Sequence, residues 1–205
     1  MLLSAPVLAA AVLCAAPSPN LDGVRLALTV DGARSDALRR LLWVHEPNDA
    51  AFPSLSPGWG GAVAVELGAS PANARWLGLF VGARGRVGVW AGPLGGSSAS
   101  TWDVGLRSRI ELTLGPLQPW VGVGSAVGSV TARLEGAERH VVAHLHELSA
   151  GLRVRLIGPV ALGLFVEALN ASSFARPPEE FTTLRLGADV TVTFELGPKR
   201  DSSAR

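Results

Sequence analysis

The most regular stretch of the chain is 182–196, TTLRLGADVTVTFEL, in which apolar and polar residues alternate throughout. Side chains of a strand point alternately to its two faces, so this alternation predicts a strand with one apolar and one charged face. At about 3.3 Å per residue the strand is roughly 45–50 Å long. A tilted strand crosses a bilayer in roughly 9–11 residues, so this one is long enough to span. The apolar row is Leu184, Leu186, Ala188, Val190, Val192, Phe194 and Leu196.

Seven further segments show the same alternation, and together they predict an all-β chain with eight strands. An even number of strands is expected of a single-chain, antiparallel, up-and-down barrel that crosses an outer membrane. In most of these segments one face is rich in Leu and Val, while the other carries glycine and charge. The additional predicted strands are 24–31, 59–67, 75–90, 102–114, 120–133, 140–156 and 160–170.

The predicted connections alternate between short and long. GASPAN, GPLQP and IGP are short turns, whereas the other connections have about 26, 10, 6 and 11 residues. Outer-membrane barrels have short periplasmic turns and longer extracellular loops, so both termini are expected in the periplasm. The longest connection, 32–57, is where we expect any extracellular partner to bind.

The two ends of the chain are predicted to lie outside the barrel. Residues 1–20, MLLSAPVLAAAVLCAAPSPN, are apolar but too short to span as a helix, which is typical of a signal peptide. An alternative interpretation is a lipoprotein leader that uses Cys14 as the lipidated residue. The barrel domain is then 21–196, and 197–205 form a polar tail.

Composition narrows the function classes. The chain has 205 residues, a net charge of +1 and one cysteine, so it is expected to be one domain without an internal disulfide. The basic residues are scattered, and this gives no reason to expect nucleic acid as a partner.

In strand number, alternation and loop asymmetry the chain resembles the small eight-stranded outer-membrane barrels of the OmpA and OmpX type. The resemblance covers nearly all of residues 24–196 and implies a monomer in the outer membrane of a Gram-negative bacterium, with a structural or surface-interaction role. Members usually end on an aromatic residue, whereas here Phe194 is followed by ELGPKRDSSAR. The alternative is a soluble, periplasmic, lipocalin-like barrel for an apolar ligand, which would place the apolar faces inside.

Twelve charged residues share the predicted inward parity. Because eight strands enclose a narrow interior, arginine forks are expected to pair with the carboxylates there and close the lumen. The functional alternative is a narrow anion-preferring pore, since seven arginines face five carboxylates. The predicted lumen network is Glu66, Arg84, Arg86, Arg107, Arg109, Glu111, Glu147, Arg153, Arg155, Glu167, Arg185 and Asp189.

Histidine is the other candidate for chemistry. His140, His144 and His146 share the lipid-facing parity of Leu148, so we interpret them as headgroup-level side chains rather than metal ligands. A lipid-modifying barrel similar to the PagL deacylases would need serine, histidine and carboxylate on one face. His146, Ser149 and Glu147 do not share a face. We therefore predict no catalytic residue, no metal site and no cofactor, and we do not expect an enzyme.

Overall fold

The structure is a computed structural model and describes residues 21–35, 39–40, 58–91, 98–134, 137–174 and 180–196. The predictions for residues 1–20 and 197–205 fall outside these ranges. The described residues contain no helix long and apolar enough to cross a membrane. The strands are β1 (Leu21–Ser35), β2 (Arg39–Arg40), β3 (Gly58–Pro71), β4 (Leu77–Ala91), β5 (Ser98–Leu112), β6 (Leu117–Leu134), β7 (Ala137–Arg155), β8 (Val160–Ser173) and β9 (Glu180–Leu196).

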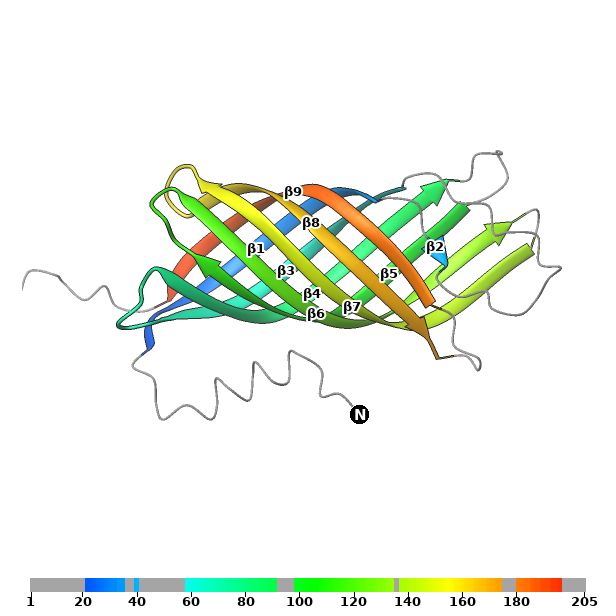
Figure 1. Cartoon of the computed structure of the whole chain (residues 1–205), viewed down its shortest axis with the longest axis horizontal. Coiled ribbons are helices and arrows are strands. Elements are labelled where there is room, and N and C mark those ends of the chain that lie inside the picture. The colour runs from blue at the N-terminus through cyan, green and yellow to red at the C-terminus, as the bar shows by residue number, and fades with distance from the viewer. Residues whose placement is uncertain are drawn as a thin grey trace, which may run out of the picture.

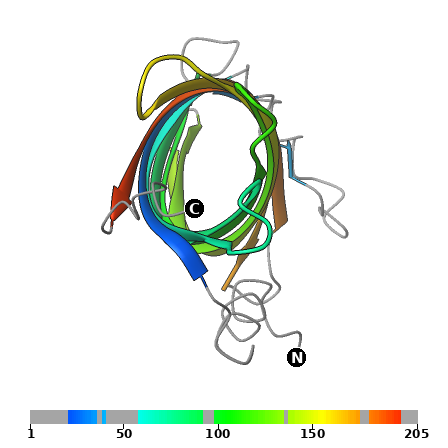
Figure 2. The ribbon, with the colours of Figure 1, turned by 90° about the vertical axis from the view of Figure 1, so that its left-hand side faces the viewer.

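The eight long strands form one closed antiparallel barrel. Each pairs with its neighbours along the chain, and β1 also pairs with β9, which leaves no free edge among them. Figure 2 shows the resulting ring end-on. The short β2 pairs with the start of β9. Leu21, Leu196 and the tight turns lie at one end of the barrel, and β2 lies at the other (Figure 1). The predicted fold class is confirmed.

The strand register sets the shape of the barrel. Leu28 of β1 pairs directly with Val192 of β9. The register partners of Leu28 can also be followed through the other strands, and this path reaches β9 at Thr182 instead. The successive partners are Val65, Ala83, Leu106, Ser125, His146, Asn170 and Thr182. The two points reached on β9, Thr182 and Val192, are ten residues apart, and this difference is the stagger of the barrel. A stagger of this size in eight strands corresponds to a tilt of about 40° and an interior that side chains can fill.

The apolar residues face outward and the charged residues face inward. Val63, Val104 and Leu186 are all more than half exposed, whereas Glu66 and Arg153 have no exposed surface. The lipocalin-like alternative requires the opposite arrangement and is therefore wrong. The apolar belt covers roughly ten residues of each tilted strand, which gives a height of about 25 Å. This matches the apolar band of a barrel that spans a bilayer.

Polarity reverses at the outer end of several strands. On β7, Ala143 and Leu145 are buried inside while His140 on the other face is exposed, and on β5 the buried Ala99 lies between exposed Ser98 and Ser100. Ala143 and Leu145 pack with Ala171 of β8 in a small apolar core. Beyond the belt, the wall therefore has apolar residues inside and polar residues outside, which is the pattern of a barrel surrounded by water.

Several strand boundaries differ from the prediction. β1 continues to Ser35, so the predicted loop 32–57 begins four residues too early, and Arg39–Arg40 form β2 within it. The remainder of that loop, 36–38 and 41–57, lies outside the described residues. β3 continues to Pro71, through part of the predicted GASPAN turn. The predicted LEGAER loop is wrong, because β6 ends at Leu134 and β7 begins at Ala137.

The predicted strand 75–90 is one continuous strand in the structure. The segment GARGR lies in the middle of β4, which runs without interruption from Leu77 to Ala91. Two of the tight turns place glycine in the left-handed region, Gly115 with φ of 65° and Gly158 with φ of 57°, and proline follows each. Glycine adopts this conformation without steric cost, which accounts for the repeated Gly-Pro at these turns.

Candidate functional site: the charged lumen and the cup above it

Eleven of the twelve residues predicted to line the lumen are buried there. They project from six strands, and none is more than 8% exposed. Arg155 is the exception, because it is the last residue of β7 and is exposed at the barrel end. Arg155 has the inward parity of Arg153, but the barrel wall does not extend far enough to enclose it. The prediction that Arg155 belongs to the buried network is therefore corrected.

Two buried carboxylates were missing from the predicted network. Asp31 of β1 and Asp103 of β5 are 9% and 4% exposed, and each contacts a lumen arginine. Their parity identifies both as inward, since Asp31 shares a strand face with Ala27 and Thr29, and Asp103 shares one with Arg107. With Arg155 removed, the described lumen holds six arginines and seven carboxylates. This reverses the predicted excess of positive charge and removes the basis for an anion-preferring pore.

The outer part of the network centres on Glu167 of β8. Its carboxylate accepts hydrogen bonds from Arg84, from Arg86 at 2.7 Å and from Arg185 at 2.6 Å. These three arginines come from β4 and β9, so the contacts cross the lumen as well as joining adjacent strands. Arg86 also donates through Nε and Nη2 to both oxygens of Asp103, at 2.9 and 3.0 Å. Such two-pronged pairs fix side-chain geometry as well as charge.

Arg84 completes this outer cluster. It reaches Asp31 at 2.7 Å and Glu147 at 2.7 Å, so β1, β4, β7 and β8 are joined through one guanidinium. Arg185 lies 3.4 Å from Asp31 as well. Every carboxylate of the cluster contacts at least one arginine, as burial in a confined interior requires.

A second cluster of charged residues lies closer to the barrel end that holds Leu21, Leu196 and the tight turns. Arg153 of β7 donates through Nε and Nη2 to Asp189 of β9, with the shortest contact at 2.8 Å. Arg109 pairs with Glu66 at 3.0 Å and with Glu111. Glu111 also accepts from Arg153 at 3.3 Å, which connects the two pairs.

Aromatic rings fill the space around these arginines. Trp120 lies 4.7 Å from the Arg107 guanidinium and 5.0 Å from that of Arg153, and Phe80 lies 4.2 Å from that of Arg109. Cation–π contact stabilises a desolvated guanidinium without adding charge. Trp120 and Trp90 are both buried inside the barrel and do not face lipid. Trp59, Trp76 and Trp102 are exposed, as a girdle requires.

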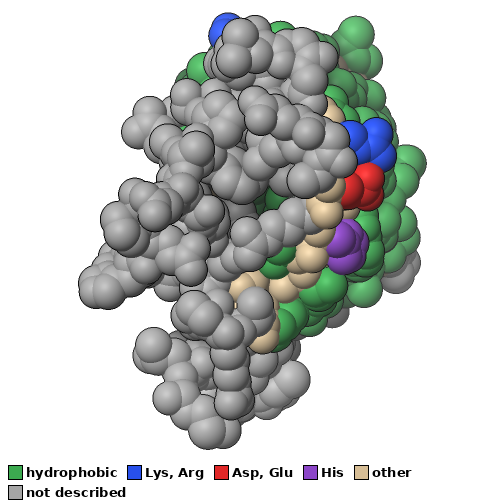
Figure 3. Space-filling view, turned by 90° about the vertical axis from the view of Figure 1, so that its right-hand side faces the viewer, with side chains coloured by type: hydrophobic (Ala, Val, Ile, Leu, Met, Phe, Trp, Pro, Cys, Tyr) green, Lys and Arg blue, Asp and Glu red, His purple; other side chains and the backbone are tan. Residues whose placement is uncertain are grey.

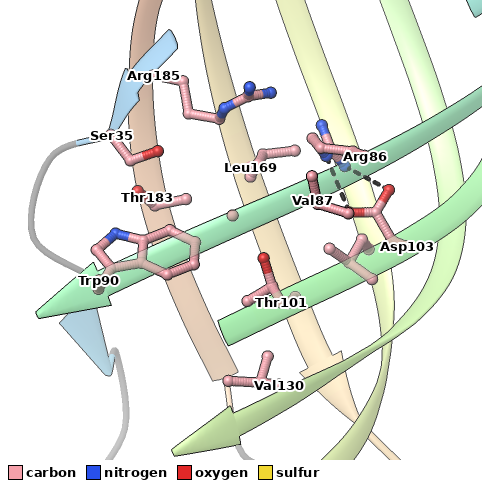
Figure 4. Close-up of a pocket in the computed structure, with 13 residues that line it drawn as sticks. Ser35, Arg86, Val87, Trp90, Thr101, Asp103, Val130, Leu169, Thr183 and Arg185 are labelled. Carbon is pink, nitrogen blue, oxygen red and sulfur yellow. Dashed lines mark hydrogen bonds and ion pairs between the residues drawn. The ribbon is translucent and has the colours of Figure 1, made fainter. Parts of the chain in front are cut away.

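Above the outer cluster the lumen opens into a cup, shown in Figure 4. Its walls are apolar, with Trp90, Val130 and Leu169 among them, and its floor is formed by Arg185 and the Arg86–Asp103 pair. The cavity volume is about 30 Å³, which is space for a few water molecules or one small apolar group. The cup lies in the outer segment where the wall polarity is reversed.

The three histidines of β7 lie on the outside of the barrel, as their parity predicts. His144 and His146 pack edge to face with ring centroids 4.4 Å apart. His140 lies farther toward the outer rim, near the exposed Arg133–Glu138 ion pair. Figure 3 shows basic, acidic and histidine side chains together beside the apolar wall. Among the described residues, no three His, Cys, Asp or Glu side chains are grouped so as to hold a metal ion.

Comparison with known proteins supports the fold. No protein-family model and no curated protein matches the chain significantly. Neisserial surface protein A matches with a TM-score of 0.52 and 13% identity, over 85% of this chain and 99% of that one. At this identity the match shows the fold alone, and it confirms the predicted small barrel of the outer-membrane type.

Two further structures match less closely. The N-terminal β-barrel domain of OprF from Pseudomonas aeruginosa has a TM-score of 0.43 and 12% identity, over 82% of this chain and 97% of that one. The attachment invasion locus protein Ail of Yersinia pestis has a TM-score of 0.42 and 10% identity, over 82% and 97%.

Proposed function

We propose that the protein is a monomeric barrel of a Gram-negative outer membrane, with a structural or surface-interaction role and a lumen that does not conduct. The observation that carries this is the ionic network across the lumen, in which six buried arginines contact seven buried carboxylates. The proposal assigns no catalysis, metal or cofactor to the lumen.

Energetics support a closed lumen. Separating a buried arginine from its carboxylate leaves an unpaired charge in a confined interior, at a cost of about 3–5 kcal/mol for each broken pair. Ions could pass only if several such pairs opened together, because Glu167 alone is held by three arginines. An interior of eight strands is just wide enough for its own side chains. The network is therefore expected to act as a permanent plug.

The barrel end opposite Leu21 and Leu196 is the proposed surface of interaction. Leu21, Leu196 and the tight turns share one end, which favours a periplasmic location for that end and an extracellular location for the other. The extracellular partner is expected at the connection 32–57, of which the structure describes 32–35 and 39–40. The polar outward faces of β5–β7 beyond the apolar belt would extend this surface into water.

Planar-bilayer recording of the refolded protein tests the closed lumen. We expect no steady current. A reproducible current would overturn the plug, and its selectivity would be informative, since an excess of one carboxylate favours cations over anions. Heat-modifiable gel mobility and fractionation with the outer membrane test the location independently. A mature protein found only in the soluble periplasmic fraction would refute the membrane assignment.

A further inference from the structure

A serine and a histidine meet on the lipid-facing wall of the barrel. The hydroxyl of Ser125 on β6 and the Nε2 atom of His144 on β7 lie 2.7 Å apart, within hydrogen-bond distance. Both side chains are half-buried and face outward, away from the charged lumen. This is the contact that a serine nucleophile makes with its general base.

Two further polar side chains surround this pair. The ring of His146 packs against that of His144 at an interplanar angle of 80°, which restricts the orientation of the His144 ring. The strand register places Asn170 of β8 beside His146, and His146 directly beside Ser125. A side-chain amide in such a position is one of the groups that stabilise an oxyanion in acyl transfer. The side chains of Ser125, His144, His146 and Asn170 thus lie on neighbouring positions of β6, β7 and β8, on one outward patch.

The depth of the patch matches the ester groups of a lipid. Ser125 lies between the outward Val123 and Val127 of β6, and on β7 the outward His146 and His144 lie between the exposed Leu148 and the exposed Val142. Farther along β6, Thr131 and Arg133 are polar. The pair therefore lies one outward position inside the outer edge of the apolar belt, which Val127 and Val142 form, and acyl ester bonds of lipids lie close to this edge.

We propose that Ser125 and His144 form a site for hydrolysis of acyl esters of outer-leaflet lipids. Ser125 Oγ attacks the ester carbonyl carbon while His144 Nε2 takes the hydroxyl proton. The carbon–oxygen bond of the ester then breaks, and His144 returns the proton to the departing alcohol. Water attacks the resulting acyl-serine in the same way, releasing the carboxylic acid and restoring the serine. His146 is a positioning residue for His144, and Asn170 donates to the oxyanion.

A second hydroxyl–histidine contact on the same two strands provides a matched control. Thr131 Oγ1 and His140 Nδ1 are 3.0 Å apart, farther from the apolar belt and through the other ring nitrogen. The Thr131→Val variant removes this contact without touching the proposed site. The Ser149 hydroxyl, by contrast, is inside the lumen, bonded to Glu147, and cannot meet a lipid.

The test uses the full barrel refolded in mixed micelles with long-chain nitrophenyl esters, together with a fluorophosphonate that labels reactive serines. We expect ester hydrolysis, and labelling of the peptide that contains Ser125. Ser125→Ala and His144→Gln should each lower hydrolysis by at least about 100-fold. Thr131→Val should retain the parent rate. Asn170→Ala should lower kcat more than it raises KM.

Each outcome bears on the proposal. The absence of both hydrolysis and labelling in the folded parent would overturn it, as would hydrolysis that survives Ser125→Ala. Heat-modifiable mobility verifies that each variant is folded, so a lost rate is not confused with a lost barrel. The proposal relies on placement of the barrel in a bilayer. Fractionation decides that placement separately, and the fluorophosphonate reaction does not depend on it.

Discussion

Arg153 and Asp189 meet directly above a glycine. They project from β7 and β9, and Gly163 of the intervening β8 is the register partner of both. A Cβ atom at Gly163 would lie 2.6 Å from Arg153 Cγ and 2.6 Å from Asp189 Oδ1. The ion pair can therefore cross β8 only because the strand between them lacks a side chain at that point.

Gly163→Val should accordingly weaken the barrel. The added side chain would displace Arg153 or Asp189 and leave part of the second cluster unpaired. The expected cost is about 3–5 kcal/mol in the free energy of unfolding. Urea unfolding in lipid vesicles measures this. Gly85→Val is the matched control, since a Cβ there would lie 4.0 Å from its nearest neighbours. Equal losses in both variants would show that the ion pair is not the cause.

Glu167→Gln should be among the most costly conservative substitutions in the lumen. The amide keeps the size of the carboxylate but removes the charge that faces Arg84, Arg86 and Arg185. We expect a loss of about 3–5 kcal/mol in the same unfolding measurement. The comparison variant is Glu138→Gln in the exposed pair with Arg133, where about 0–1 kcal/mol is expected. A Glu167→Gln protein as stable as the parent would contradict an essential role for the outer cluster.

Val190→Arg tests the lipid-facing side of the barrel. Val190 points outward near the middle of the apolar belt and is 43% exposed, so arginine there should cost about 2–4 kcal/mol in a bilayer. Ser100→Arg, also outward but beyond the belt on β5, should cost about 0–1 kcal/mol. Comparable costs at the two positions would refute the proposed limits of the belt.

The proposed topology is tested by protease added to intact cells. Cleavage is expected within 32–57 and not at the turns that contain Gly115 and Gly158, because those turns lie at the opposite end of the barrel. Mass spectrometry of the released peptides identifies the cut. If cleavage at 32–57 occurred only after the outer membrane had been broken, the barrel would have the reverse orientation.

The faces of the strands could be predicted from sequence because their period of two is imposed by backbone geometry. Parity correctly placed Glu66 and Arg109 inside and Val190 outside, without knowledge of any partner. Asp31 and Asp103 also have the inward parity of their strands, so the same period of two contains the information for both.

The ion-pair partners, some strand ends and the contacts between strands could not be predicted, because the spacing of residues along one strand does not determine them. Which arginine meets which carboxylate depends on the ten-residue stagger, and Arg84 and Glu167 are brought together across the lumen only by closure of the barrel. The predicted strands 102–114 and 160–170 stop short of the outer ends of β5 and β8, because Ala99 and Ala171 are apolar and inward there, opposite to the pattern used to recognise the strands. The Ser125–His144 contact joins two strands, and parity along one strand could not find it.

The reversal of polarity along β5–β8 also gives the barrel a preferred hydrophobic thickness. In a bilayer thicker than about 25–30 Å, hydrocarbon would have to cover outward polar groups such as Ser100 and Asn170. In a thinner one, Trp102 and Leu148 would be left in water. Refolding yield across vesicles of increasing acyl-chain length should therefore pass through a maximum. Mismatch on either side would be met by deformation of the lipid, because a closed barrel cannot relieve it by tilting single strands.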